Sequence, residues 1–122
     1  MISRIQYAQL KENIASNKIV LLTGPRRVGK RTAVQNALAE LAVSAVEFDA
    51  SNKKTKKLFE IVNVKNLTIN FNGSKFVVIH EAQYLENLQE MIELVLSGEI
   101  NSTLILCCSY EPMIDEIGRA HV

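Results

Sequence analysis

Short apolar runs alternate with amphipathic stretches along this chain. Four of the runs are bounded by turn-forming or polar residues, as expected of strands that are buried on both faces of a sheet. These predicted strands lie within residues 19–24, 43–51, 76–83 and 102–109.

The amphipathic stretches predict helices. Apolar residues recur near helical spacing within residues 1–15, 31–42, 52–67 and 85–98. In the third of these stretches we expect Leu58, Ile61 and Val62 to face inward, and we expect Gly98 to cap the fourth helix. Strands that alternate with helices are typical of an α/β fold, in which helices cover a parallel sheet.

Length and composition are those of a single globular domain, residues 1–122. The net charge is +1, which gives no overall electrostatic reason to expect a nucleic acid or a membrane as partner. No apolar run approaches the roughly 18 residues of a membrane-spanning helix, and the N-terminus lacks an apolar signal core. We therefore expect a cytoplasmic protein with no membrane partner.

The two cysteines, Cys107 and Cys108, are adjacent in the fourth predicted strand. Neighbouring side chains of a strand point to opposite faces, so these thiols are not placed to form a disulfide. We expect buried, reduced thiols, which suit a reducing cytoplasm.

Four lysines stand at the start of the third predicted helix, namely Lys53, Lys54, Lys56 and Lys57. Such a group could contact the phosphates of a nucleic acid. No aromatic residue is interleaved with the lysines, which favours a solvated helix start instead. On this basis the sequence does not indicate a nucleic-acid partner.

The connection between the first predicted strand and the next helix has the pattern of a phosphate-binding loop. Gly24, Gly29 and Lys30 fit Gly-x-x-x-x-Gly-Lys, in which backbone N–H groups and a helix N-terminus hold phosphate oxygens while the lysine reaches the β- and γ-phosphates. An ordinary strand-to-helix turn is the alternative interpretation. The candidate nucleotide-binding residues are Gly24, Pro25, Arg26, Arg27, Val28, Gly29, Lys30, Arg31 and Thr32.

One position of this loop breaks the pattern. A Ser or Thr normally follows the lysine and supplies a hydroxyl ligand for Mg²⁺, but here Arg31 follows it and Thr32 comes one residue late. Successive helix residues are about 100° apart, so we expect Thr32 to point away from the site. Arg31 would instead place a guanidinium near the position of the ion, where it could neutralise phosphate oxygens.

A second group of polar residues ends the third predicted strand, where His80 and Glu81 follow an apolar run. Nucleotide-hydrolysing proteins with a phosphate loop carry Asp-Glu here, and the aspartate orders the metal shell while the glutamate activates water. Glu81 retains the carboxylate of a general base. The His80 imidazole cannot replace aspartate as a hard oxygen ligand for Mg²⁺. The pair could equally be a polar cap of the strand.

Two motifs, "GPRRVGK" at residues 24–30 and "HEAQYLENLQEMIELVL" at residues 80–96, resemble the AAA+ superfamily of P-loop ATPases, and within it the bacterial and archaeal AAA-domain proteins. The resemblance covers nearly all of the chain. It implies that Ser109, at the end of "LILCCS", senses the γ-phosphate. It also implies that Arg119, in "IGRA", reaches toward the γ-phosphate of this or a neighbouring subunit.

The resemblance carries further expectations for fold and ligands. It implies a three-layer P-loop NTPase-like fold with the strand order loop strand, sensor strand, acidic strand, second strand. It also implies binding of ATP and Mg²⁺, followed by hydrolysis. The fifth strand, the helical lid and the C-terminal domain of such proteins would follow residue 122. We therefore expect the N-terminal fragment of a longer protein that contacts a protein partner or forms a homo-oligomer.

The two departures affect one feature, because Arg31 and His80 both stand where the family supports its metal ion. Thr32 and His80 are the metal candidates, and neither suits the role. Two functions therefore remain open. The first is an ATP-binding enzyme domain in which Lys30 holds phosphate and Glu81 orients the attacking water. The second is an ATPase-like scaffold for protein contacts with weak or no hydrolysis.

Overall fold

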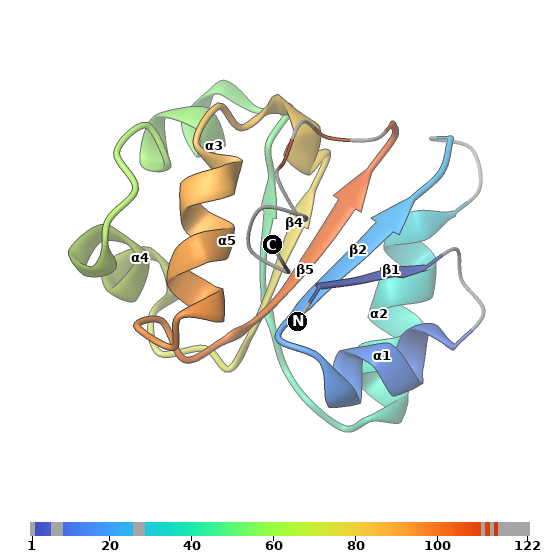
Figure 1. The fold of residues 1–122 in the computed structure, drawn as a ribbon. Coiled ribbons are helices and arrows are strands. Elements are labelled where there is room, and N and C mark those ends of the chain that lie inside the picture. Colours follow the sequence, from blue (N-terminus) through green and yellow to red (C-terminus); the bar gives the residue numbers. More distant parts are fainter. Residues whose placement is uncertain (1, 6–8, 26–28, 111, 113, 115–122) are drawn as a thin grey trace.

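The computed structural model describes residues 2–5, 9–25, 29–110, 112 and 114, which form an α/β fold (Figure 1). The strands are β1 (Ile2–Ile5), β2 (Ile19–Thr23), β3 (Val46–Asp49), β4 (Phe76–His80) and β5 (Thr103–Cys108). They form one sheet in the order β1-β2-β5-β4-β3, with every neighbouring pair parallel. The expected order of loop strand β2, sensor strand β5, acidic strand β4 and second strand β3 is confirmed.

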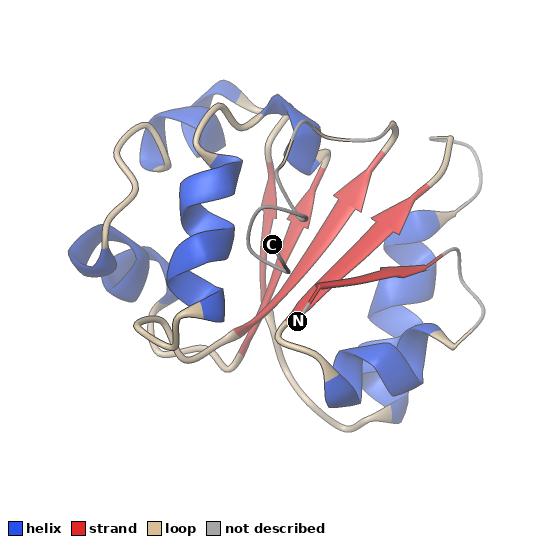
Figure 2. Ribbon diagram, viewed as in Figure 1, coloured by secondary structure: helices blue, strands red, loops and turns tan. Residues whose placement is uncertain are grey.

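Helices cover both faces of this sheet. They are α1 (Leu10–Ser16), α2 (Lys30–Glu40), α3 (Lys53–Leu58), α4 (Val64–Phe71) and α5 (Leu88–Leu96), with a short 3-10 helix, η2 (Ala82–Tyr84). Helices α1 and α2 pack on one face, and α4 and α5 pack on the other (Figure 2). The three-layer arrangement predicted from the sequence is therefore present.

Alternating side chains of the central strands supply the two cores. In β5, Leu106 and Cys108 belong to the core under α5, whereas Ile105 and Cys107 belong to the core under α2. Every residue of β5 is buried, and burying a side chain such as Leu106 contributes about 1.5–3 kcal/mol. Both cysteines are reduced thiols, and they are buried on opposite faces of the sheet, as predicted.

The N-terminal segment differs from the prediction. Residues 1–15 do not form one helix, because residues 2–5 form β1 and α1 begins only at Leu10. Strand β1 pairs with β2 in the register Ile2 to Ile19 and gives the sheet a fifth strand at this end of the chain. Hydrogen bonds to the open edge of β2 compete with helix formation, and β-branched isoleucines suit a strand.

The third predicted helix is two helices. Asn63 caps the start of α4, where its side chain accepts a hydrogen bond from a backbone N–H group of that helix. This break changes which side chains face inward, so Leu58 and Ile61 are 39% and 64% exposed while Phe59 is only 2% exposed. The prediction was wrong for Leu58 and Ile61, whereas Val62 does pack against the core.

Parallel pairing brings the carboxyl ends of the strands to one edge of the sheet. The segments that begin at Gly24, Ala50, Glu81 and Ser109 all leave the sheet at this edge. At the other edge Gly98 follows α5 with a φ of 88°, as expected of a helix cap. Among the described helices, none is long and apolar enough to cross a membrane.

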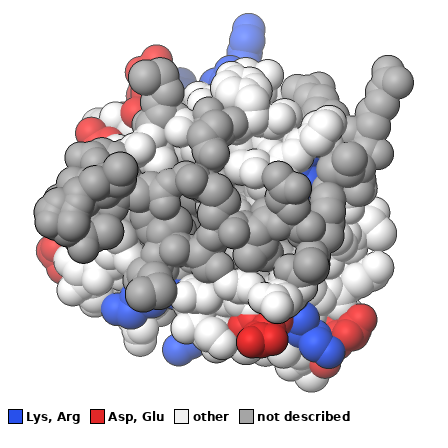
Figure 3. Space-filling view, turned by 45° about the vertical axis from the view of Figure 1, so that its right-hand side comes forward, with Lys and Arg blue, Asp and Glu red and all other residues white. Residues whose placement is uncertain are grey.

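The charged side chains form no single-signed surface on the face drawn in Figure 3. On that face the described acidic and basic residues lie around the rim and are interspersed along its lower part. The arrangement agrees with the net charge of +1.

Candidate functional site

The loop after β2 joins the strand to α2 through glycines at both of its ends. The N–H of Gly24 donates to the carbonyl of Cys108 at 3.1 Å, which ties the start of the loop to β5. Gly29 has φ 78° and ψ 34°, a left-handed conformation that favours glycine, and it is the N-cap of α2. Three of the predicted loop residues lie outside the described part of the chain, namely Arg26, Arg27 and Val28.

The N-terminus of α2 suits an anion. The N-cap residue Gly29 provides no side-chain hydrogen bond, and the first turn holds no acidic residue. The first N–H groups of a helix have no partners within the helix, and the helix dipole places positive potential there. The amides of Lys30, Arg31 and Thr32 belong to this turn, and amides in this position fit phosphate oxygens.

Lys30 is folded back across the loop. Its side chain is buried, with 5% of the residue exposed. The ammonium Nζ donates to the carbonyls of Gly24 at 2.6 Å and Pro25 at 2.9 Å. An ammonium group has three N–H donors, so the two carbonyl contacts leave one N–H of Lys30, which lines the cavity described below.

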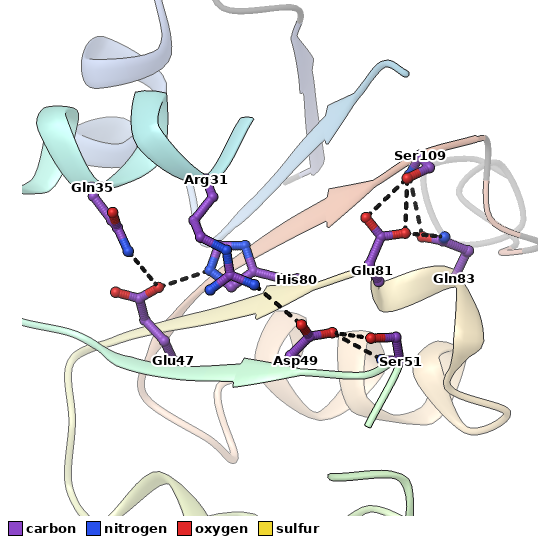
Figure 4. A network of polar contacts seen from close by, with 9 residues as sticks. All are labelled: Arg31, Gln35, Glu47, Asp49, Ser51, His80, Glu81, Gln83 and Ser109. Carbon is purple, nitrogen blue, oxygen red and sulfur yellow. Dashed lines mark hydrogen bonds and ion pairs between the residues drawn. The ribbon is translucent and has the colours of Figure 1, made fainter. Parts of the chain in front are cut away.

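The side chain of His80 contacts a carboxylate of the neighbouring strand, β3 (Figure 4). It is 4% exposed, and its Nε2 lies 2.7 Å from Oε1 of Glu47 on β3. Gln35 of α2 donates to the same Glu47 oxygen at 3.4 Å. One imidazole nitrogen of His80 is thus paired with a carboxylate of the protein.

Arg31 reaches across the same face of the sheet to Asp49, the last residue of β3. Its Nη2 lies 3.2 Å from Oδ2 of Asp49, whose other oxygen accepts hydrogen bonds from the N–H and hydroxyl of Ser51. Burial opposes ionisation of this carboxyl, but the Ser51 hydrogen bonds and the charges of Arg31 and His80 outweigh it and lower the pKa of Asp49. Asp49 is therefore an anion at neutral pH.

Glu81 and Ser109 meet where β4 and β5 end. The hydroxyl of Ser109 donates to both carboxylate oxygens of Glu81, at 2.8 and 2.9 Å, and Gln83 donates to Glu81 at 2.7 Å. Glu81 has φ 55° and ψ 43°, a left-handed conformation that is uncommon for a residue with a side chain. The predicted base and the predicted sensor are thus in direct contact.

A cavity of about 270 Å³ lies between the helix N-terminus and these strand ends. It is lined by Gly29, Lys30, Arg31, Asp49, Ser51, His80, Glu81 and Cys107. Burial and the neighbouring Cys108 raise the pKa of the Cys107 thiol to about 12, so this cysteine stays protonated and is not a nucleophile. Thr32 is exposed and does not line the cavity, and Arg119 lies outside the described residues.

Two acidic residues of this site, Glu47 and Asp49, were not singled out from the sequence. They are two positions apart on β3, so both side chains lie on the face that α2 covers. Asp49 stands directly beside His80 in the parallel register. The signal in the sequence was the alternation of acidic positions in "EFDAS", which becomes informative only once β3 is known to lie next to β4.

The groups that the cavity offers to a metal ion differ from those that the family resemblance implies. Mg²⁺ takes oxygen ligands, usually one or two carboxylates with phosphates and water. The cavity offers Asp49 and Glu81, but the first is paired with Arg31 and the second accepts hydrogen bonds from Ser109. Among the described residues there is no group of three or more His, Cys, Asp or Glu placed to hold a metal ion.

A nucleotide-binding fold explains the glycine loop, the buried lysine and the polar strand ends together. A search of curated proteins finds no match to this chain. A protein-family model described as an AAA domain matches residues 16–120, which include β2, the loop, β4 and β5. On this match and this geometry, the chain belongs to the AAA domain family of nucleotide-binding proteins.

Proposed function

We propose that this chain binds ATP with its phosphates at the loop and at the N-terminus of α2. Lys30 and the amides of the first helical turn contact the β- and γ-phosphates. Support comes from the two carbonyl contacts that hold the Lys30 ammonium in the cavity, and from the uncapped helix N-terminus beside it. The family match agrees with a nucleotide ligand.

The Arg31–Asp49 pair carries the second part of the proposal, which is that ATP binds without a strong requirement for Mg²⁺. A bound Mg²⁺ would bridge phosphate oxygens and neutralise their charge. Here the guanidinium of Arg31 already lines the cavity, 3.2 Å from the carboxylate that such an ion would need. Arg31 thus supplies fixed positive charge near the phosphates, and a metal ion would have to compete with it for Asp49.

Hydrolysis by this chain is proposed to be slow. A general base must reach the proton of the attacking water, and Glu81 is already hydrogen-bonded to the hydroxyl of Ser109 and the amide of Gln83. A γ-phosphate that drew Ser109 toward itself would release one of these contacts. Ser109 therefore acts in this proposal as the sensor that links the phosphate to Glu81, and Arg119 is the proposed arginine finger.

A scaffold without nucleotide turnover is the second candidate function. It is favoured by the two side-chain contacts that cross from β3 to the metal-supporting positions, Glu47 to His80 and Asp49 to Arg31. If these pairs stay closed, the domain keeps its fold and offers its surface to a protein partner. Measured ATP affinity separates the two functions, because a scaffold of this kind binds ATP weakly or not at all.

Single-turnover hydrolysis of radiolabelled ATP tests the proposal. We compare the unaltered chain with a variant that carries Arg31→Thr and His80→Asp, with Glu47→Gln added to avoid two facing carboxylates. Lys30→Met serves as the control for phosphate binding. The unaltered chain should bind ATP but hydrolyse it at least about tenfold more slowly than the triple variant. The triple variant regains the residue types that support a metal ion, and a single catalytic interaction is worth at least about tenfold in rate. Equal rates would contradict the proposal.

A further inference from the structure

A second cleft, of about 440 Å³, lies between α3 and η2. The segments that line it follow β3 and β4, the two strands whose ends also line the first cavity. Lys53, Lys56 and Lys57 of α3 line one side, and Tyr84 of η2 lines the other. The cleft shares no lining residue with the first cavity, although the segments that line it directly follow strands that reach that cavity.

The three lysines carry charge that the protein does not neutralise. All three residues are exposed. Within the described part of the chain, none of their ammonium groups forms an ion pair with a carboxylate. Three unpaired ammonium groups on two turns of one helix make a local positive surface in a chain whose net charge is +1.

Tyr84 supplies the aromatic residue that the lysine segment lacks in the sequence. Tyr84 is 38% exposed, and the Nζ of Lys56 lies 5.2 Å from the centroid of its ring. Absence of an interleaved aromatic residue was the reason to regard the lysines as a solvated helix start. The fold removes that reason, because it places an aromatic ring against the lysines from a distant part of the chain.

We propose that this cleft binds single-stranded nucleic acid, with phosphates on Lys53, Lys56 and Lys57 and one base stacked on Tyr84. Basic grooves that contain an aromatic ring bind single strands in this way, because the lysines follow the backbone and any base can stack. An unstacked base is required, so a single strand fits better than a duplex. The Tyr84 ring favours a nucleic acid over an acidic protein, because an acidic protein would need only the lysines for binding. A cleft of about 440 Å³ is large enough for one nucleotide unit.

Two acidic residues, Glu60 and Glu86, also line the cleft and set its polarity. Both carboxylates repel phosphates, so in this proposal the backbone contacts the lysines of α3 and the base enters toward Tyr84 of η2. Neutralising both carboxylates should tighten binding of a nucleic acid. The same change would weaken binding of a cationic partner, so its sign identifies the charge of the ligand.

Fluorescence anisotropy with a labelled oligothymidylate tests the proposal on the whole chain without nucleotide. The logarithm of the affinity should fall with the logarithm of salt concentration with a slope of about −2, since each neutralised phosphate of a single strand contributes about −0.7. Lys56→Gln/Lys57→Gln should reduce the slope to about −0.7. The matched control is Lys65→Gln/Lys75→Gln, two exposed lysines that do not line the cleft, and it should leave both slope and affinity nearly unchanged.

The stacking contact has its own variants. Tyr84→Ala should weaken binding about tenfold, and Tyr84→Phe, which keeps the ring, should not. Glu60→Gln/Glu86→Gln should tighten binding, an outcome that a folding defect does not produce. Absence of binding at low salt would overturn the proposal. An affinity that neither Tyr84→Ala nor Lys56→Gln/Lys57→Gln changes would also overturn it. A third contradicting result would be that polyglutamate competes as well as unlabelled oligothymidylate while Tyr84→Ala has no effect.

Discussion

Replacing Asp49 with asparagine should make this chain slightly less stable and yet tighten its binding of ATP. The carboxylate of Asp49 lines the cavity in which we propose that the phosphates bind, and its lowered pKa keeps it charged at neutral pH. It therefore repels a triphosphate and also holds the guanidinium of Arg31. The amide of asparagine is similar in size and can still accept the hydrogen bonds from Ser51, but it carries no charge.

The size of both effects follows from exposure. The side chains of Arg31 and Asp49 are 51% and 40% exposed, and an exposed ion pair of this kind contributes about 0.2–1 kcal/mol. Its loss should lower the melting temperature by about 1–4 °C. Release of Arg31 and removal of the repulsion should together strengthen ATP binding by about 1 kcal/mol, which is roughly a fivefold lower Kd.

The pH dependence has a defined sign. Because the pKa of Asp49 is lowered in the folded state, its contribution to stability is present above the ordinary value of 3.8 and is lost as the pH falls through the lowered pKa. The two proteins should therefore differ in stability at neutral pH and converge in acid.

Isothermal titration calorimetry in EDTA measures the ATP affinity of the unaltered chain, Asp49→Asn, Arg31→Ala and the double variant. Asp49→Asn should have a smaller effect on the affinity when Arg31 is already absent, because only the repulsion is then removed. Unchanged or weaker ATP binding by Asp49→Asn would refute the view that this carboxylate competes with the phosphates for Arg31.

Three other changes examine the surroundings of the site and the corrected part of the fold. His80→Asp alone should destabilise the protein by about 2–4 kcal/mol in urea unfolding, because it places a second carboxylate against Glu47 at a position that is 4% exposed. Adding Glu47→Gln should restore more than half of the lost stability. No restoration would show that Glu47 is not the cause. Cys107 and Cys108 should resist alkylation at about pH 8 until the protein is unfolded, since both are buried and the pKa of Cys107 is about 12. Because the pKa of Cys107 is raised in the folded state, the free energy of unfolding should also fall as the pH rises above 9.0. Rapid labelling of the folded protein would contradict this. Phe59→Ala should lower the free energy of unfolding by about 3–5 kcal/mol, since the ring of Phe59 packs against Phe48 and Phe71. Ile61→Ser, at a position that is 64% exposed, should change it by less than about 0.5 kcal/mol. A larger effect of Ile61→Ser than of Phe59→Ala would support the original helix prediction.

The sequence was sufficient for β2, β3, β4, β5 and the loop, because each depends on a local pattern, whereas the order of these strands followed from the resemblance to the AAA+ superfamily. Continuous apolar runs mark strands that are buried on both faces, and the spacing of Gly24, Gly29 and Lys30 marks the turn into α2. Residues 2–5 could not be assigned in the same way. Their isoleucines fit both a helix and a strand, and the choice depends on the free edge of β2.

The site was only partly predictable for a related reason. Arg31, His80 and Glu81 stand in recognisable motifs, and the structure brings them to one cavity. Their partners Glu47 and Asp49 come from β3, which has no motif of its own and reaches them through the β3–β4 register. The contact between Lys56 and Tyr84 likewise joins two segments that only the fold brings together.

The affinity of the unaltered chain for ATP in EDTA and in excess Mg²⁺ tests the central claim most directly. If Arg31 supplies the positive charge beside the phosphates, the two dissociation constants should agree within about threefold, and Arg31→Thr should weaken binding in EDTA and gain a dependence on Mg²⁺. Binding by the unaltered chain that requires Mg²⁺, with more than about a tenfold difference between the two conditions, would contradict the account.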